Sequence, residues 1–451
     1  MGKYFGTDGF RGEANVGLTV MHAFEIGRYL GWYYGRDHKA RIVIGKDTRR
    51  SSYMFESALC AGLTASGADA CLLHVTTTPS VSFVARADDF DCGIMISASH
   101  NPYYDNGIKL INGRGEKMDD EMLSGIEEYI DRVQSGEKDT LPYAVGEKIG
   151  RTVDYSAGRN RYIGYLISLA TRSYKGKKVG LDCANGSTWM MAKSVFDALG
   201  ADTYVIANNP DGININVDCG STHIEKLRSF VLEKGLDVGF AFDGDADRCL
   251  LVDEKGSVID GDKVLAVCGR SMRRRGILNG DAIVATVMSN LGLHEFCRKG
   301  DYRLVCTDVG DRHVLEKMIE CGYMIGGEQS GHTIFREFAT TGDGELTALQ
   351  FIQAYCEAGV PASELVSCCA QYPQELINVP VSAVGGAKER IMGDERLWEQ
   401  VRKHEDALHG EGRILVRPSG TEALIRVMVE AKTVETAHTV AQALADFIKN
   451  I

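Results

Sequence analysis

The sequence predicts an α/β protein with three similar units, each on a mixed or mostly parallel sheet, and a smaller C-terminal α+β unit. Two observations carry this prediction. A strand–helix–strand–helix–strand pattern occurs three times along the 451 residues, and a polar loop follows it each time. The residues after Ala370 depart from that alternation. Alternating strands and helices favour parallel sheets covered by helices on both faces, with ligands beyond the carboxyl ends of the strands.

The first pattern begins at Arg41. Continuous apolar or β-branched runs indicate strands, and apolar residues at helical spacing indicate helices. The expected elements are a strand at 41–45, a helix at 52–66, a strand at 70–74, a helix at 79–87 and a strand at 92–97. The last strand runs into Ser99, and another short strand is expected at 107–110.

The same reading recurs twice. In the second pattern we expect strands at 178–183, 202–206, 236–242 and 249–252, with helices at 187–199 and 222–234. In the third we expect strands at 282–287, 302–306, 323–326 and 333–335, with helices at 290–299 and 310–321. These units could share a pattern without sharing a site, but all three loops are rich in Gly, Asp, Ser and His.

The C-terminal part is expected to hold strands at 378–381, 413–416 and 424–430 and a helix at 434–448. A chain of this length exceeds one ordinary core. We therefore expect four closely packed domains, at 1–155, 156–256, 257–370 and 371–451.

Composition narrows the class of protein. Hydrophobic residues make up 44% and charged residues 25%, as in ordinary globular proteins. The chain has no apolar run of the roughly 18 residues that a membrane span needs and no apolar signal segment after Met1, and its 13 cysteines form no Cys-x-x-Cys pair. A reducing cytosol fits these features. The net charge of −12 argues against nucleic acid and membranes as partners, although basic residues recur in the glycine-rich loops.

Ser99 lies in the run Ser-Ala-Ser-His-Asn-Pro, directly after the third strand of the first pattern. A serine hydroxyl becomes a useful nucleophile when its neighbours position it or accept its proton. His100 is adjacent, and Lys109 follows ten residues on. The other interpretation is a loop-capping hydroxyl.

Asp243, Asp245 and Asp247 alternate after a buried strand. Two carboxylates about 4 Å apart repel by about 4 kcal/mol at an effective dielectric near 20, so three that converge need a cation. Oxygen ligands favour Mg²⁺ or Ca²⁺. An EF-hand is excluded because Arg248 stands where that loop requires glycine and because strands flank the motif. A solvated acidic turn is the remaining alternative.

Four further loops could bind a substrate. Glu328, Ser330 and His332 offer groups that suit sugar hydroxyls, and Thr307 to Arg312, with Gly310, could border the same site. Guanidinium groups, hydroxyls and backbone N–H groups suit a phosphate, or else mark an ordinary exposed turn. They occur at Arg417, Ser419, Gly420, Thr421 and Arg426 and, near the start, at Arg11 between Gly6 and Gly12.

Together and in this order, Ser-Ala-Ser-His-Asn-Pro, Asp-Gly-Asp-Ala-Asp-Arg, Gly-Glu-Gln-Ser-Gly-His and Arg-Pro-Ser-Gly-Thr-Glu resemble the α-D-phosphohexomutase family. The resemblance spans the whole chain. It implies three related α/β domains and a smaller C-terminal domain around a central cleft. It also implies a phosphorylated Ser99 and Mg²⁺ bound by Asp243, Asp245, Asp247 and the phosphoryl oxygen on Ser99.

Within the family, Gln329 and the segment Pro210–Asn216 resemble members that act on glucosamine phosphates, in amino-sugar nucleotide and cell-wall precursor supply. The sequence departs from the usual pattern of these members at Phe10, at Ala423 and at 333–338, which lie at the edges of the motif loops. The implied reaction interconverts glucosamine 6-phosphate and glucosamine 1-phosphate through a hexosamine bisphosphate, which also serves as activator. Members acting on glucose or mannose phosphates are the alternative, and a phosphoserine phosphatase or a sugar-phosphate binding protein are others.

The resemblance also assigns roles. Arg11 and Arg248 would stabilise the transferring group, with Lys109 as general base or electrostatic partner and His100 and His332 in support. Thr307, Gly310, Glu328 and Ser330 would bind the sugar, and Arg417, Ser419, Gly420, Thr421 and Arg426 the non-reacting phosphate. The expected partner is a small-molecule sugar phosphate, and the expected assembly is a monomer or homodimer.

Overall fold

The computed structural model describes residues 2–6, 8–382, 386–419 and 423–451. The chain divides into two compact units. The larger unit runs to Met288 and continues through Tyr302–Cys368, and the smaller unit comprises Ser289–Asp301 and Cys369–Ile451.

The larger unit begins with a seven-stranded sheet in the order β1-β2-β6-β5-β3-β4-β7. Its strands are β1 (Phe5–Gly6), β2 (Gly9–Glu13), β3 (Arg41–Lys46), β4 (Asp69–Val75), β5 (Cys92–Ile96), β6 (Asp105–Asn112) and β7 (Thr152–Asp154). The helices of this part are α1 (Val20–Tyr34), α2 (Arg50–Ala65), α3 (Thr78–Ala87) and α4 (Asp120–Gln134). β3, β4, β5 and β7 are parallel, whereas β6 runs antiparallel to β5 and to β2.

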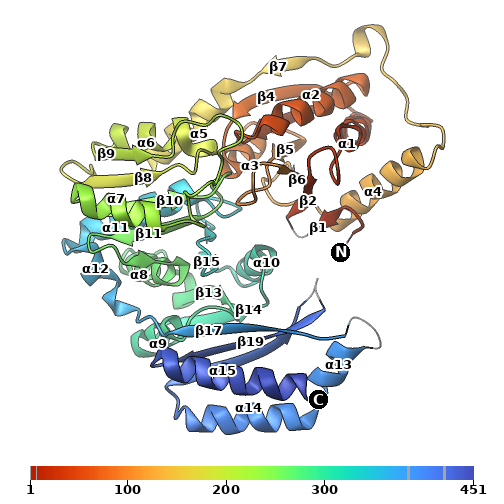
Figure 1. Ribbon diagram of the computed structural model, residues 1–451. Coiled ribbons are helices and arrows are strands. Elements are labelled where there is room, and N and C mark those ends of the chain that lie inside the picture. The colour runs from red at the N-terminus through yellow and green to blue at the C-terminus, as the bar shows by residue number, and fades with distance from the viewer. Residues whose placement is uncertain (1, 7, 383–385, 420–422) are drawn as a thin grey trace. The chain divides into compact units, whose positions relative to one another are not determined.

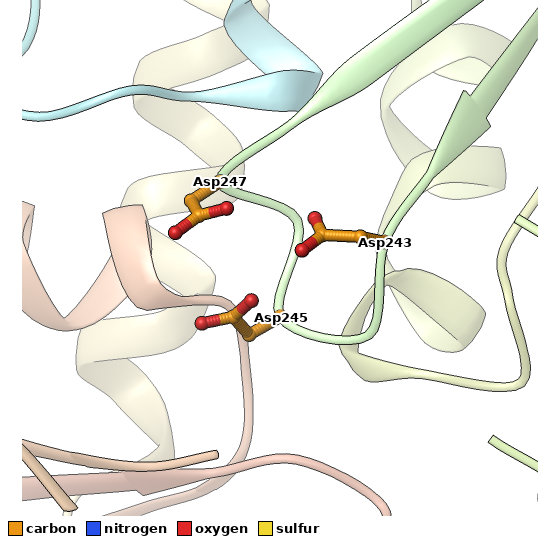
Figure 2. Close-up of side chains that lie close together, drawn as sticks. All are labelled: Asp243, Asp245 and Asp247. Carbon is orange, nitrogen blue, oxygen red and sulfur yellow. The ribbon is translucent and has the colours of Figure 1, made fainter. Parts of the chain in front are cut away.

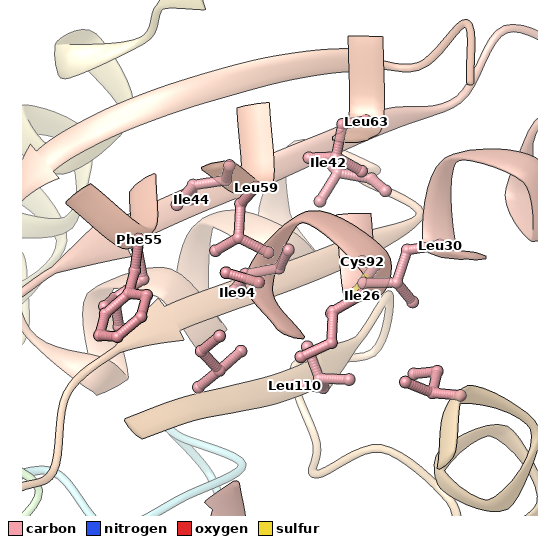
Figure 3. Packing of buried hydrophobic residues seen from close by; sticks show 14 of the residues in the cluster. Ile26, Leu30, Ile42, Ile44, Phe55, Leu59, Leu63, Cys92, Ile94 and Leu110 are labelled. Carbon is pink, nitrogen blue, oxygen red and sulfur yellow. The ribbon is translucent and has the colours of Figure 1, made fainter. Parts of the chain in front are cut away.

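Helices cover both faces of the central strands of this sheet. Ile42 and Ile44 of β3 pack in one cluster with residues of α1 and α2 such as Ile26 and Leu59, as Figure 3 shows. Val43, between them, packs with residues of α3 in a cluster on the other face. Since side chains alternate along a strand, burial of both faces explains why the apolar run of β3 is continuous.

The second sheet has the order β12-β11-β10-β8-β9. Its strands are β8 (Lys178–Asp182), β9 (Asp202–Ile206), β10 (Val238–Phe242), β11 (Cys249–Asp253) and β12 (Val258–Ile259). The helices nearby in sequence are α5 (Ser156–Ser168), α6 (Ala192–Ala198) and α7 (Glu225–Lys234). β8 is parallel to β9 and β10, and β11 is antiparallel to β10.

The third sheet has the order β14-β13-β15-β16. Its strands are β13 (Ala282–Thr286), β14 (Arg303–Thr307), β15 (Ile325–Gly327) and β16 (Thr333–Phe335). The helices of this part are α8 (Gly261–Arg274), α10 (Asp311–Cys321), α11 (Gly344–Ala358) and α12 (Ala362–Leu365). β16 is antiparallel to β15, so in all three sheets the strand after the polar loop turns back along its predecessor.

The smaller unit holds an antiparallel sheet in the order β17-β19-β18. Its elements are α9 (Leu291–Gly300), β17 (Gln374–Pro380), α13 (Ala387–Met392), α14 (Glu395–Ala407), β18 (Gly412–Pro418), β19 (Leu424–Ala431) and α15 (Val434–Lys449). α15 packs on β17 and β19, and α14 lies beside α15 (Figure 1). α9 connects β13 to β14 in sequence but belongs to this unit, where the N–H of Leu291 donates to buried Glu430 at 2.8 Å.

The predicted fold class is confirmed: three mixed α/β sheets precede a smaller α+β region. The expected helix at 187–199 is instead a short 3-10 turn, Ser187–Met190, followed by α6. The expected arginine loop at Gly6–Gly12 is largely the hairpin of β1 and β2, so Arg11 lies on a strand. Among the described residues, no helix is long and apolar enough to cross a membrane.

Candidate active site

The three polar loops follow β5, β10 and β15 and meet within the larger unit. The N–H of Thr78, at the start of α3, donates to the carbonyl of Asp245 at 3.0 Å, which joins the first part of the chain to the second loop. The N–H of Cys249 donates to the carbonyl of Gly331 at 3.1 Å, which joins the second loop to the third. The three patterns therefore contribute to one site.

The carboxylates of Asp243, Asp245 and Asp247 point toward a common space on the loop between β10 and β11 (Figure 2). One oxygen from each lies within 4.8 Å of the others, and all three residues are buried. Oδ1 of Asp245 and Oδ1 of Asp247 are buried, and neither has a hydrogen-bond partner within the described part of the chain. Three converging oxygen donors with orphaned atoms fit a hard divalent cation.

Ser99 faces this triad. Its hydroxyl donates to Oδ2 of Asp243, and its residue is 1% exposed. His100 Nδ1 lies 3.4 Å from the same hydroxyl. Burial and the neighbouring charges of Asp247 and Asp245 raise the pKa of Asp243 well above its ordinary value. The serine oxygen thus lies beside the carboxylates that could hold a cation.

Gly244 allows these two loops to approach each other. A Cβ on this residue would lie 2.5 Å from the carbonyl oxygen of Ser99, which is closer than real Cβ atoms come. Any side chain here would separate the serine loop from the carboxylates.

Lys109 lies on β6 and reaches the triad from the sheet. Its Nζ is 2.8 Å from Asp245, 3.1 Å from Asp247 and 3.2 Å from Asp8. Burial alone would lower the pKa of Lys109, but the carboxylates outweigh it and raise this pKa well above its ordinary value. A general base would need a lowered pKa, so this geometry does not support that role for Lys109. It fits the electrostatic alternative.

The pKa values of the two histidines shift in opposite directions. Burial, assisted by Arg248 and Arg11, lowers the pKa of His100 to about 4, so this imidazole is neutral at pH 7. His332 lies 3.5 Å from Asp311 and 3.9 Å from Asp247. Burial opposes its protonation, but these carboxylates raise the pKa of His332 above its ordinary value.

Arg11 and Arg248 lie at the edge of the same site. Arg11 pairs with Asp8 and donates to Oδ1 of Asn101 at 3.4 Å. The backbone N–H of Arg248 donates to Asp243 at 3.1 Å, and its guanidinium is 3.9 Å from Asp247. Among the residues that the structure describes, the buried Nε–H groups of both arginines have no hydrogen-bond partner, which leaves donors for an anion.

The sugar-loop candidates lie on neighbouring loops of the third sheet. Oε1 of Glu328 accepts from the N–H of Gly310 at 3.2 Å, which brings the β14–α10 and β15–β16 loops together. Thr307 donates to the carbonyl of Asp308 at 2.9 Å, so its hydroxyl is engaged locally. Ser330 is exposed.

The remaining candidates belong to the smaller unit. Arg417 on β18 and Arg426 on β19 are directly opposite in register. Burial and the adjacent Arg426 lower the pKa of Arg417 from its ordinary value. Ser419 is buried and its carbonyl accepts from Lys388 at 2.8 Å. Gly420 and Thr421 lie outside the described residues.

Sequence reasoning missed several residues that build the site. Asp8, Lys117 and Asp311 form an ion-pair chain, with Lys117 Nζ 3.2 Å from Asp8 and 2.8 Å from Asp311. Asp8 and Asp311 lie in the polar segments 6–12 and 307–312, but nothing in the sequence pairs them. Arg49 and Asn216 contact the Ser99 backbone, and only Asn216 lay in a noted motif.

The models of the four phosphoglucomutase/phosphomannomutase domains match this chain: domain I at 2–137, domain II at 160–256, domain III at 260–372 and the C-terminal domain at 376–447.

The chain is similar to curated proteins along its full length. It is 60% identical to the phosphoglucosamine mutase of Lachnoclostridium phytofermentans over 98% of this chain and 97% of that protein. It is 44% identical to the phosphoglucosamine mutase of Bacillus subtilis over 100% of this chain and 99% of that protein.

Solved structures share the fold. A phosphoglucomutase/phosphomannomutase family protein from Burkholderia thailandensis matches with a TM-score of 0.80 at 21% identity, over 99% of this chain and 97% of that one. N-acetylphosphoglucosamine mutase from Aspergillus fumigatus, in complex with GlcNAc-6P and magnesium, matches with a TM-score of 0.63 at 18% identity, over 99% and 95%.

Proposed function

Because the chain belongs to the α-D-phosphohexomutase family, as an enzyme of the phosphoglucosamine mutase group, we propose that it interconverts glucosamine 6-phosphate and glucosamine 1-phosphate. The single observation that carries the proposed mechanism is the hydrogen bond from Ser99 to Asp243 inside a cluster of three buried carboxylates. A nucleophilic oxygen beside a cation site is the arrangement that phosphoryl transfer uses.

The proposed reaction is a two-step exchange. Phosphorylated Ser99 donates its phosphoryl group to the free 1- or 6-hydroxyl of the substrate: the bond from phosphorus to the serine oxygen breaks and a bond to the sugar oxygen forms. The proton of the sugar hydroxyl passes in net terms to the serine oxygen. The resulting bisphosphate reverses its orientation in the site and returns its other phosphoryl group to Ser99. A small amount of hexosamine bisphosphate would therefore also activate unphosphorylated enzyme, by donating a phosphoryl group to Ser99.

Positive charge near the transferring group is supplied by the arginines. The Nε–H groups of Arg11 and Arg248 donate no hydrogen bond to the described residues, and the guanidinium of Arg248 lies 3.9 Å from Asp247 of the triad. Lys109 places a positive charge against Asp245 and Asp247, and it lowers the pKa of Asp247. His100, neutral and 3.4 Å from the serine hydroxyl, and His332 complete the polar lining. Charge stabilisation of this kind is usually the largest part of catalysis.

Asp243, Asp245 and Asp247 would hold a divalent cation, and Mg²⁺ is the proposed ion. When bound, it would withdraw charge from the phosphoryl oxygens. Glu328 and Ser330, with Thr307 and Gly310 of the adjoining loop, are the proposed sugar-binding residues. Arg417, Ser419, Gly420, Thr421 and Arg426 are proposed for the non-reacting phosphate, and the four domains are proposed at 1–155, 156–256, 257–370 and 371–451.

Phosphorus NMR tests the substrate. The purified protein with Mg²⁺ and a trace of hexose bisphosphate is given glucosamine, glucose and mannose 6-phosphates in parallel. The fastest isomerisation is expected for glucosamine 6-phosphate. Preference for glucose or mannose would overturn the assigned substrate and keep the mechanism.

Replacing Ser99 by alanine tests the nucleophile. The variant should lose nearly all turnover and all covalent phosphate measured by intact mass. Activity within tenfold of wild type would refute the assignment. Steady release of inorganic phosphate by wild type without isomerisation would indicate a phosphatase. Binding of the sugar phosphate without covalent phosphate on Ser99 would indicate a binding protein.

A further inference from the structure

The segment Pro210–Asn216, which has no part in the mechanism above, reaches the backbone of the serine loop. The side-chain amide of Asn216 donates to the carbonyl of Ser99 at 2.8 Å and to the carbonyl of Asn101 at 3.2 Å. Its own backbone is fixed, since the N–H of Asn216 donates to the carbonyl of Ala184 at 2.9 Å. The residue is 7% exposed.

A second donor meets the same two carbonyls. Nη2 of Arg49 lies 3.1 Å from the oxygen of Ser99 and 2.6 Å from that of Asn101. Arg49 is completely buried and paired with Asp47, whose other partners are the N–H of Arg49 and the hydroxyl of Ser52. The carbonyls of Ser99 and Asn101 are therefore each held by one donor that follows β3 and one that follows β9.

Arg49 and Asn216 together form a clamp on the serine loop, and the backbone that they hold has an unusual conformation. Ser99 has a φ of 53°, in the left-handed region that residues other than glycine seldom adopt. Such a conformation costs about 1 to 3 kcal/mol and persists only where the surroundings fix it. Fixing the carbonyl of Ser99 also fixes the direction of its side chain, which here donates to Asp243.

We propose that Asn216 is a positioning residue for the phosphorylatable serine: with Arg49, its amide holds the Ser99–Asn101 backbone in the conformation that directs the serine oxygen toward the carboxylate triad. This inference rests on the proposed role of Ser99 in phosphoryl transfer. Asn216 itself has a φ of 61°, which asparagine tolerates better than most residues. The requirement for both a donor and a left-handed backbone explains why asparagine suits this position.

Two substitutions separate the amide from the backbone. N216D keeps the shape but places a carboxylate against two carbonyl oxygens, and N216G keeps the positive φ and removes the donor. N214D is the matched control, because the Asn214 amide donates within its own loop, to the carbonyl of Asn209, and contacts neither Ser99 nor Asn101. For each protein we would measure kcat and KM for glucosamine 6-phosphate, per folded molecule by circular dichroism, and hydrogen–deuterium exchange of the peptide spanning 97–102.

Both Asn216 variants should lower kcat by about 10- to 100-fold, since a misplacement of about 1 Å can cost that much. KM should stay within about threefold, because Asn216 contacts the loop and not the substrate. Amide exchange in the peptide spanning 97–102 should accelerate at least about tenfold, because the hydrogen bonds from Asn216 to this segment are lost. N214D should match wild type in all three. A kcat within threefold of wild type for N216G, or a change confined to KM, would overturn the positioning role.

The exchange measurement keeps this inference separate from the proposed function. If wild type isomerises no sugar phosphate, the proposed function fails, while faster exchange in N216G still supports the clamp. If wild type turns over and N216G exchanges like wild type, the clamp alone is refuted.

Discussion

Replacing Lys109 by methionine should destabilise the protein strongly in the absence of divalent cations. Methionine keeps the length and apolar stem of the side chain and removes its charge. Lys109 lies within 3.2 Å of the carboxylates of Asp8, Asp245 and Asp247, and Asp245 is completely buried. Removing one partner of a buried ion pair costs about 3–5 kcal/mol, because the other charge is left uncompensated.

The expected loss converts into a melting temperature. Domains of about 150–250 residues lose about 2–4 °C per kcal/mol, so Lys109→Met should melt at least about 6 °C below wild type in chelator at pH 7.5. Scanning fluorimetry measures the difference, and Lys109→Arg, which keeps the charge, should fall by clearly less. Adding Mg²⁺ should recover more stability in Lys109→Met than in wild type, since the cation would then supply the missing positive charge.

Equal melting temperatures for Lys109→Met and wild type in chelator would refute the electrostatic account of this residue. Equal gains from Mg²⁺ in the two proteins would refute the link between Lys109 and the triad. In either case the general-base role would need to be reconsidered.

Three further perturbations test other parts of the structure. Gly244→Ala should destabilise the fold by about 1–3 kcal/mol and reduce turnover, because its Cβ would meet the Ser99 carbonyl at 2.5 Å. Gly164→Ala is the control in thermal unfolding, because a Cβ there would meet no described atom within 4 Å outside its own helix. Asp245→Asn should abolish the rise in melting temperature that Mg²⁺ gives wild type, whereas the exposed Asp211→Asn should keep it; equal shifts would contradict the metal site. Burial raises the pKa of Asp343 to about 6, so its contribution to stability is full below about pH 4 and is lost as pH rises through 6. Between pH 4 and pH 8 wild type should therefore lose about 3 kcal/mol relative to Asp343→Asn, and parallel denaturation curves at both pH values would show that Asp343 does not titrate there.

The central strands were predictable because burial of both faces leaves a continuous apolar signal. β3, β8 and β13 are all formed by such continuous apolar runs, and the polar loops mark the ends of β5, β10 and β15. β1 and β2 were not predicted as strands. Together they contain three glycines and two charged residues, and β2 gains its place by pairing with β6, about a hundred residues away. No local pattern carries that information.

The residues of the candidate site also divide into those that the sequence could predict and those that it could not. Ser99 and the three aspartates stand out because they directly follow buried strands, at the edge of the sheet where α/β proteins bind ligands. The direction in which the pKa of Lys109 shifts could not be predicted, since it depends on which carboxylates face the ammonium group. The contacts of Asn216 and Arg49 with Ser99 were equally inaccessible, because they join segments 117 and 50 residues apart.

The balance of charge in the site bears on its need for a cation. Asp243, Asp245 and Asp247 crowd one face of Ser99, and carboxylates about 4 Å apart already repel by about 4 kcal/mol at an effective dielectric near 20. A phosphoryl group on Ser99 would add up to two negative charges there. Lys109 already pairs with Asp245 and Asp247, and Arg248, 3.9 Å from Asp247, adds positive charge at the edge of the triad. Phosphorylation of Ser99 should therefore tighten the binding of a divalent cation, and by linkage the cation should favour the phosphorylated enzyme by the same factor.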